Sequence, residues 1–233
     1  MLKKILVTGG EGRFAKELKR TKSRYNFFFK NKKEFNILSY QSIERKLKKF
    51  KPDAVIHLGG LSRPMSIHEK NINLSIDLNI IGTANLVKAC SKNNIKIIFL
   101  STSYLYPGNK GNYKEDDPLL PWNNYGWSKL GAESAVQMYK NSLIIRACMT
   151  EKPFLHKYAF SNVKCNFIFH DAFIKIFLKV LKFKGVLNIG GKSQSIYSFA
   201  KKYNKKVKKK KSKGELPLNI CMSLKKVNQL IEK

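Results

Sequence analysis

Three short segments of the chain carry side chains that suit dinucleotide binding and the transfer of a hydride and a proton. They are Thr8-Gly9-Gly10-Glu11-Gly12-Arg13-Phe14-Ala15, Ser101-Thr102-Ser103 after an apolar run, and Tyr125-Gly126-Trp127-Ser128-Lys129. The glycines could hold a pyrophosphate, and the other two segments supply a hydroxyl, a phenol and an ammonium. Each segment alone is weak evidence, but their order along the chain predicts one active site.

The first segment has the glycine spacing of a phosphate-binding turn. Gly9, Gly12 and Ala15 lie where an expected strand at residues 3–8 turns into an expected helix at residues 12–20. Gly9 permits a tight turn, Gly12 lets a phosphate approach the backbone, and Ala15 lets the helix pack on the strand. The pyrophosphate would meet the helix N-terminus, where amide groups lack partners within the helix. An ordinary glycine turn is the alternative, and the position between strand and helix favours binding.

Tyr125 and Lys129 lie four residues apart on an expected helix, so they share one face. An ammonium beside a phenol lowers the phenol pKa and lets the tyrosine exchange a proton near neutral pH. In a lysine-rich chain, a chance match is the alternative. Thr102 supports the catalytic interpretation because it ends the strand expected at residues 95–100, and open α/β sheets bind ligands at the carboxyl ends of their strands.

The elements that must position these residues alternate along the chain. Strands are expected at residues 3–8, 25–29, 54–58, 95–100, 143–145 and 185–190, and helices at 12–20, 41–50, 71–92, 171–183, 198–203 and 223–231. This alternation predicts an α/β fold, a Rossmann-like doubly wound parallel sheet with helices on both faces and a small, reduced C-terminal substrate lobe. We expect a dinucleotide-binding domain at 1–147 and a substrate region at 148–233, in which 171–190 return a helix and a strand to the sheet.

Composition limits the remaining classes of protein. The chain has 233 residues, of which 43% are hydrophobic, and this is the composition of a globular protein. No apolar run approaches the roughly 20 residues of a membrane span, and the apolar start is too short for a signal peptide, so we expect a cytoplasmic protein. The four cysteines lack CxxC spacing and are expected to be buried free thiols, with no metal site and no disulfide: Cys90, Cys148, Cys165 and Cys221.

The net charge of +31 would attract anionic partners. Its lysines are spread along the whole chain, and the one dense block, residues 205–211, is interpreted as a solvated loop or tail. We expect no specific nucleic-acid partner, because the chain has no recognised nucleic-acid module and no aromatic platform beside that block.

Taken together, these segments resemble the extended short-chain dehydrogenase/reductases of the NAD-dependent epimerase/dehydratase superfamily that modify nucleotide sugars. The matching stretches are the glycine motif and residues 53–60, 79–86, 101–108, 125–129 and 185–191. Within that superfamily, the segment Ser101-Thr102-Ser103-Tyr104-Leu105-Tyr106-Pro107-Gly108 is similar to the one in dTDP-4-dehydrorhamnose reductases.

The resemblance implies a catalytic trio in which Tyr125 is the acid, Thr102 polarises the carbonyl, and Lys129 holds the nicotinamide ribose and tunes Tyr125. The cofactor residues that it implies are Gly9, Gly12, Arg13, Phe14, Asn36, Ile37, His57, Leu58, Gly59, Asn79, Tyr125 and Lys129, and the substrate residues are Arg63, Ser103 and Tyr104. Related proteins often carry an acidic residue at the position of Asn36. His57 is equally well interpreted as a strand histidine whose ring nitrogens are satisfied.

The implied function is NAD(P)H-dependent reduction of a keto group on a nucleotide-linked sugar, in cell-surface polysaccharide biosynthesis. The cofactor is NADP or NAD, with NADPH favoured by Arg13 and by the lysines after the second strand, and a homodimer is the candidate assembly. Ser103 replaces the acidic residue of the dehydratases, which argues against elimination of water. Two alternatives remain open: a nucleotide-sugar 4-epimerase with tightly bound NAD, and a catalytically idle NAD(P)-binding sensor or scaffold.

Overall fold

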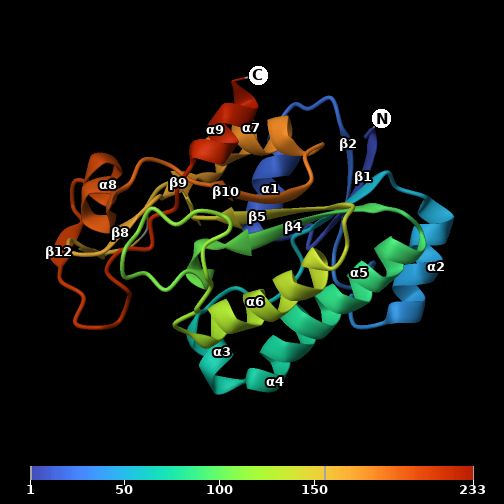
Figure 1. Ribbon diagram of the computed structural model, residues 1–233, viewed down its shortest axis with the longest axis horizontal. Helices are drawn as coiled ribbons and strands as arrows, with labels where there is room; N and C mark the ends of the chain where they lie inside the picture. Colours follow the sequence, from blue (N-terminus) through green and yellow to red (C-terminus); the bar gives the residue numbers. More distant parts are fainter. Residues whose placement is uncertain (1, 155, 233) are drawn as a thin grey trace. The chain divides into compact units, whose positions relative to one another are not determined.

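The computed structural model describes residues 2–154 and 156–232 (Figure 1). By their contacts, these residues form two units that interleave along the chain. The first unit runs to Ser101 and adds Asn123–Ile145 and Leu181–Val186. The second comprises Thr102–Trp122, Arg146–Val180 and the chain from Leu187 onward. The domain boundary expected at residue 147 stays a prediction.

A six-stranded sheet has the strand order β10-β5-β4-β3-β1-β2. Its members are β1 (Lys4–Thr8), β2 (Asn26–Lys30), β3 (Ala54–His57), β4 (Lys96–Thr102), β5 (Ser142–Ala147) and β10 (Gly185–Ile189). β1 pairs in parallel with β2 and β3, and β3 pairs in parallel with β4. Every residue of β3 and β5 is buried, as befits inner strands of a sheet that is covered on both faces. The prediction of a Rossmann-like α/β fold is confirmed.

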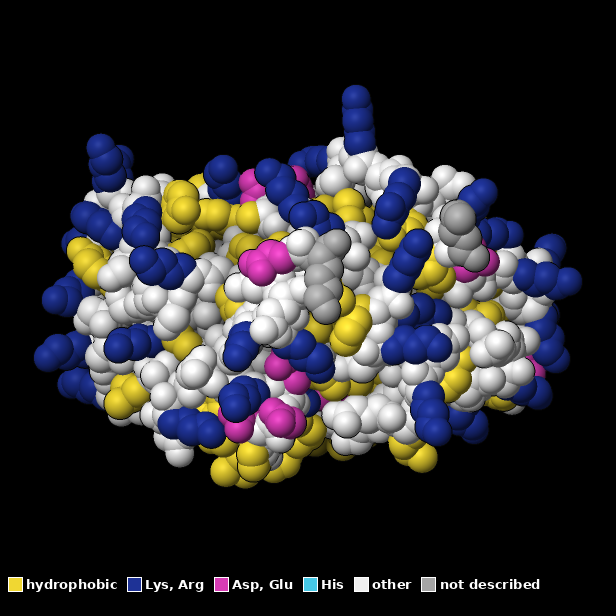
Figure 2. Space-filling view, turned by 45° about the horizontal axis from the view of Figure 1, so that its top comes forward, with side chains coloured by type: hydrophobic (Ala, Val, Ile, Leu, Met, Phe, Trp, Pro, Cys, Tyr) yellow, Lys and Arg dark blue, Asp and Glu magenta, His cyan; other side chains and the backbone are white. Residues whose placement is uncertain are grey.

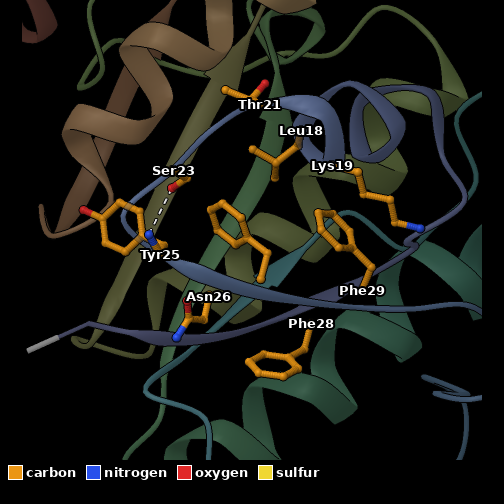
Figure 3. Close-up of a pocket in the computed structure, with 9 residues that line it drawn as sticks. Leu18, Lys19, Thr21, Ser23, Tyr25, Asn26, Phe28 and Phe29 are labelled. Carbon is orange, nitrogen blue, oxygen red and sulfur yellow. Dashed lines mark hydrogen bonds between the residues drawn. The ribbon is translucent and has the colours of Figure 1, made fainter.

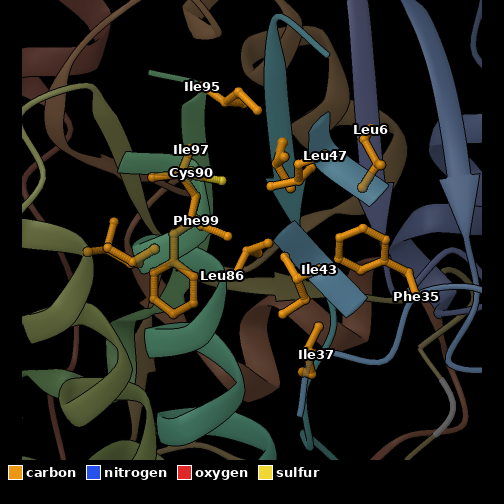
Figure 4. Close-up of a cluster of buried hydrophobic side chains, with 14 of the residues drawn as sticks. Leu6, Phe35, Ile37, Ile43, Leu47, Leu86, Cys90, Ile95, Ile97 and Phe99 are labelled. Atoms are coloured by element: carbon orange, nitrogen blue, oxygen red, sulfur yellow. The ribbon is translucent and has the colours of Figure 1, made fainter. Parts of the chain in front are cut away.

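Four helices of the first unit cover this sheet. They are α1 (Arg13–Arg20), α2 (Tyr40–Phe50), α5 (Gly82–Lys92) and α6 (Asn124–Gln137). In Figure 1, α2, α5 and α6 lie on one side of the sheet and α1 on the other. On α2, Ile43 and Leu47 form a buried apolar stripe and pack into one core with Leu6, Leu86 and Ile97 (Figure 4).

The single helix expected at residues 71–92 is wrong in detail. The structure divides it into α4 (Ile72–Ser75), a π-helical turn η1 (Ile76–Ile81) and α5, and a further short helix α3 (Ser66–Lys70) precedes them. In the π turn, the Gly82 N–H donates to the Asp77 carbonyl, and a Cβ on Gly82 would lie only 2.7 Å from Ile37. Close packing of Gly82 on a residue distant in sequence is a tertiary constraint that helical periodicity does not contain.

The second unit combines short strand pairs with three helices. Parallel pairs join β6 (Met149–Thr150) to β9 (Ile168–Phe169) and β7 (Tyr158–Phe160) to β12 (Lys208–Lys210), and β8 (Lys164–Cys165) runs antiparallel to β11 (Gln194–Ser195). The helices are α7 (His170–Val180), α8 (Ile196–Tyr203) and α9 (Lys225–Ile231), and η2 (Ser103–Leu105) is a 3-10 turn. This unit has its own core, which contains Tyr106, Tyr113, Val163, Phe169 and Phe199.

The lysine block at residues 205–211 is more ordered than a loop or tail, because it contains β12. Main-chain pairing with β7 requires no particular side chain, and the three lysine side chains of β12 remain exposed. The burial expected for the four cysteines is observed: Cys90, Cys148, Cys165 and Cys221 are all buried, as free thiols.

Lysine and arginine side chains are scattered over the face shown in Figure 2, with few acidic side chains between them. Over residues 2–154 and 156–232, no helix has both the length and the apolar character needed to cross a membrane.

Candidate active site

The glycine turn after β1 brings two strand ends into backbone contact. Gly9 has a φ of +67°, and a Cβ there would lie 2.7 Å from the Gly59 nitrogen and 2.8 Å from the Leu58 carbonyl carbon. Only glycine tolerates this geometry. The turn therefore joins the end of β1 to the segment that follows β3, the place where the sequence predicts the cofactor.

Gly12 directly precedes α1, with φ −64° and ψ 159°. A Cβ on Gly12 would lie 3.2 Å from Gly9 O, and apart from its chain neighbours and the backbone of α1 it would meet no other atom of the described residues within 4 Å. The surface above the start of α1 is therefore free of side-chain bulk, and the helix N-terminus offers amides and a partial positive charge. This arrangement fits a pyrophosphate. Arg13 is exposed beside it, and Phe14 is buried on the inner face of α1.

His57, at the end of β3, is buried with both ring nitrogens engaged. Nδ1 lies 2.8 Å from Thr8 Oγ1 and Nε2 lies 3.0 Å from Thr83 Oγ1, while the Gly59 N–H donates to Thr8 Oγ1 at 3.1 Å. Burial, and secondarily the charge of Lys129, lower the pKa of His57 to about 3, so the ring is neutral. These bonds tie the ends of β1 and β3 together and favour the interpretation of His57 as a satisfied strand histidine.

Tyr125 and Lys129 both lie on α6, whose first turn is capped by Asn123: its Oδ1 accepts the Gly126 N–H at 2.8 Å. Lys129 is half-buried, and its ammonium contacts groups of β4. It donates to the Leu100 carbonyl at 2.8 Å and lies 3.9 Å from the centre of the Phe99 ring. Burial lowers the pKa of Lys129 to about 7, with the Glu133 carboxylate acting in the opposite direction.

Asn79, on the π turn, links the segment after β3 to α6. Its Nδ2 donates to Ser128 Oγ at 2.8 Å and to the Leu61 carbonyl at 3.0 Å, and its Oδ1 accepts the Leu61 N–H at 2.7 Å. Ser128 Oγ in turn donates to the Tyr125 carbonyl at 2.8 Å. The sequence predicted that Asn79 binds the cofactor, and it predicted no role for Ser128. The position of Ser128 between Tyr125 and Lys129 was the one local signal for it.

The other predicted residues of the first unit lie in two segments. Asn36 is exposed and its Oδ1 accepts the Leu38 N–H at 3.1 Å, whereas Ile37 is buried and its carbonyl accepts from Asn85 Nδ2 at 3.2 Å. Arg63 is exposed in the segment between β3 and α3.

Thr102, Ser103 and Tyr104 belong to the second unit. Thr102 ends β4, is 7% exposed, and its Oγ1 accepts the Tyr104 N–H at 3.3 Å. Ser103 is buried, and the Tyr104 ring packs on Trp122 with centroids 5.1 Å apart. The joint action of Thr102 with Tyr125 and Lys129 stays a prediction.

A pocket of about 430 Å³ lies elsewhere in the first unit, between α1 and the edge strand β2 (Figure 3). Leu18 and Lys19 of α1 face it, together with Tyr25, Phe27 and Phe29. None of the residues that line it is a predicted site residue, so we do not assign it to the chemistry of Tyr125.

Comparison with known proteins gives one family match. The family described as the RmlD substrate binding domain matches residues 3–150. Methionine adenosyltransferase 2 subunit beta of Xenopus laevis is 33% identical over 101 residues, which are 43% of this chain and 30% of that protein. Spore coat polysaccharide biosynthesis protein SpsK of Bacillus subtilis is 32% identical over 148 residues, 61% of this chain and 52% of that protein. The chain thus spans at most about half the length of these relatives.

Among solved structures, dTDP-4-dehydrorhamnose reductase from Bacillus anthracis in complex with NADP superposes with a TM-score of 0.85 at 19% identity. The superposition covers 98% of this chain and 92% of that one. Similarity at this level of identity concerns the fold, which the two chains share over nearly their whole length.

Proposed function

Because the chain belongs to the RmlD substrate binding domain family, as its resemblance to dTDP-4-dehydrorhamnose reductases predicted, we propose that it is a nicotinamide-dependent reductase of a keto group on a nucleotide-linked sugar. The observation that carries this proposal is the placement of Tyr125 and Lys129 on one face of α6, with the Lys129 ammonium held at the end of β4 by the Leu100 carbonyl. A phenol with a neighbouring amine at that end of the sheet suits proton transfer to a carbonyl oxygen.

In this proposal the turn formed by Gly9 and Gly12 holds the cofactor pyrophosphate at the N-terminus of α1. A nicotinamide cofactor held there in its reduced form would supply the hydride for the carbonyl carbon of the substrate. Tyr125 donates its phenolic proton to the carbonyl oxygen, and the Thr102 hydroxyl donates a hydrogen bond to the same oxygen. Lys129 donates to the ribose hydroxyls and supports the phenol electrostatically.

NADPH is the proposed cofactor. Exposed Arg13 stands at the start of α1, and Asn36 places an amide rather than a carboxylate after β2. Among the lysines expected to help, Lys30 forms an ion pair with Glu34 at 3.0 Å. Arg13, in the glycine turn itself, is the proposed cation for the 2′-phosphate. A role in polysaccharide assembly is supported by the name of SpsK. The cytoplasmic location and the homodimer stay predictions.

A second candidate is a cofactor-binding subunit without turnover. It is favoured by the similarity to methionine adenosyltransferase 2 subunit beta, a protein whose name describes a subunit. Normal cofactor binding with no turnover of any keto-sugar nucleotide would support this candidate. Copurified NAD with interconversion of sugar epimers would instead support the epimerase.

The test is a panel of nucleotide-linked 4-keto sugars with NADPH and NADH, followed by the loss of nicotinamide absorbance. We expect turnover with at least one of these sugars, and NADPH to serve at least as well as NADH. Tyr125→Phe removes the acid but keeps the ring, so turnover should fall by roughly 10²–10⁴-fold while cofactor affinity is retained.

The matched control is Tyr203→Phe, which removes a phenol that is 52% exposed on α8. It should leave turnover unchanged. A folded Tyr125→Phe protein with full activity would refute the mechanism.

A further inference from the structure

Tyr125 is the second residue of α6 and lies in its first turn. The first amide groups of a helix have no acceptors within the helix, so this turn frays unless groups outside the helix hold it. Besides the Asn123 cap, contacts with other elements of the first unit therefore help to set the orientation of a phenol in this position.

Glu69, on the short helix α3, holds the start of α6. Its Oε1 accepts the Asn124 N–H at 3.2 Å, and its Oε2 accepts from Asn124 Nδ2 at 2.5 Å. A carboxylate at a helix N-terminus is also favoured by the helix dipole. Glu69 thus fixes the residue directly before Tyr125.

His68, the neighbour of Glu69, contacts the ring of Tyr125 itself. The two ring centroids are 5.1 Å apart with planes at 59°, within the range of favourable aromatic pairs. His68 is completely buried, and its Nδ1 lies 2.7 Å from Oγ of Ser75 on α4. The hydrogen bond to Ser75 fixes the imidazole ring, and the phenol ring of Tyr125 packs against this fixed imidazole.

The imidazole is neutral at neutral pH, because burial lowers the pKa of His68. The backbone of Ser62 and the Glu69 carboxylate act in the opposite direction. A neutral ring packed on the phenol ring contributes shape rather than charge.

We propose that His68 and Glu69 are positioning residues that set the orientation of the Tyr125 phenol: Glu69 anchors the first turn of α6, and His68 fixes the ring. This inference rests on the proposed role of Tyr125 in proton transfer. Nothing in the types or spacing of these two residues pointed to it, because α3 and α6 are separated by more than fifty residues of chain.

The central experiment compares His68→Asn with His68→Phe. Asparagine keeps a polar atom near the position of Nδ1 for Ser75 but removes the ring, whereas phenylalanine keeps the ring and loses the bond. Misplacement of a reacting group by about 1 Å can cost on the order of 10²-fold in rate, so His68→Asn should lower kcat strongly. The KM for the sugar nucleotide and the affinity for NADPH should change little. His68→Phe should recover most of the lost kcat.

Glu69→Gln and Lys70→Ala form a second pair on the same helix. Gln keeps one acceptor for the Asn124 N–H but places an amide donor against Asn124 Nδ2, so kcat should fall moderately. Lys70 is exposed, and Lys70→Ala should have no effect.

An activity-independent readout is the ¹⁹F NMR signal of 3-fluorotyrosine at position 125, assigned by its loss in Tyr125→Phe. His68→Asn should shift and broaden this signal, and Lys70→Ala should leave it unchanged. Unchanged kcat and an unchanged signal in His68→Asn would overturn the proposal. The proposal would also be overturned if His68→Asn and His68→Phe lost kcat to the same extent and in proportion to their loss of thermal stability. That pattern indicates a purely structural role.

Failure of the proposed function gives a different result. In that case Tyr125→Phe is fully active, or no sugar nucleotide is turned over, while the ¹⁹F signal still reports whether His68 orients the ring.

Discussion

Lys129 shows how burial sets the properties of a single residue. Its pKa is lowered from 10.5 to about 7, so the folded state holds fewer protons than the unfolded state between these two pH values. The free energy of unfolding is therefore lowered by its full amount below about pH 7, and this loss decreases as the pH rises towards 10.5. At ~1.4 kcal/mol per pKa unit, Lys129→Met should stabilise the protein by up to several kcal/mol at about pH 6, and the gain should shrink at about pH 9. Urea denaturation at the two pH values measures the difference.

The control for this substitution is Lys140→Met, which replaces an exposed lysine just beyond α6. Its effect on the free energy of unfolding should be small at both pH values. Equal stability of Lys129→Met and the unchanged protein at the lower pH would show that the ammonium is solvated.

At the scale of elements, the strand–turn–helix unit formed by β1 and α1 leads to a prediction about Gly12. Its backbone angles are accessible to any residue, and the contact that a Cβ would make among the described residues distant from Gly12 is Gly9 O at 3.2 Å, so Gly12→Val should fold. The branched side chain would stand where the proposed pyrophosphate approaches α1, and calorimetry should show that most NADPH affinity is lost. Gly12→Ala, with one methyl group, should have an intermediate affinity. Unchanged NADPH binding by Gly12→Val would place the cofactor elsewhere.

At the scale of the whole molecule, each unit has its own core, and the core of the second unit contains a buried polar network. Arg146 donates to Tyr106 Oη at 2.8 Å, and Tyr106 Oη donates to Asn188 Oδ1 at 2.8 Å. Burial raises the pKa of Tyr106 to about 12, so the phenol stays protonated. Tyr106→Phe would deprive two buried groups of a partner and should destabilise the protein by about 1–3 kcal/mol in urea denaturation. Tyr158→Phe, at a phenol that is 51% exposed, is the control and should be neutral; an equal effect of both variants would contradict this role of the network.

The features of this protein that depend on neighbouring residues could be predicted from the sequence. Alternating apolar runs predicted the strands of the first unit and the helices α1 and α2, and the glycine spacing predicted the turn where Gly9 lies at positive φ. The spacing of Tyr125 and Lys129 likewise predicted a shared helix. These features follow from periodicity and local sterics, which a short window of sequence contains.

Contacts between residues that are distant in sequence became known only from the folded structure. Contact between Gly82 and Ile37 accompanies the π turn within the expected long helix, and packing of α3 against α6 brings His68 to Tyr125. The strand β12 exists because its backbone pairs with β7, although its side chains indicated only a solvated lysine tract. The lowered pKa of Lys129 has the same origin, since it comes from the surroundings of the ammonium. Each of these properties depends on contacts between groups far apart in the chain, and a local sequence pattern does not specify such contacts.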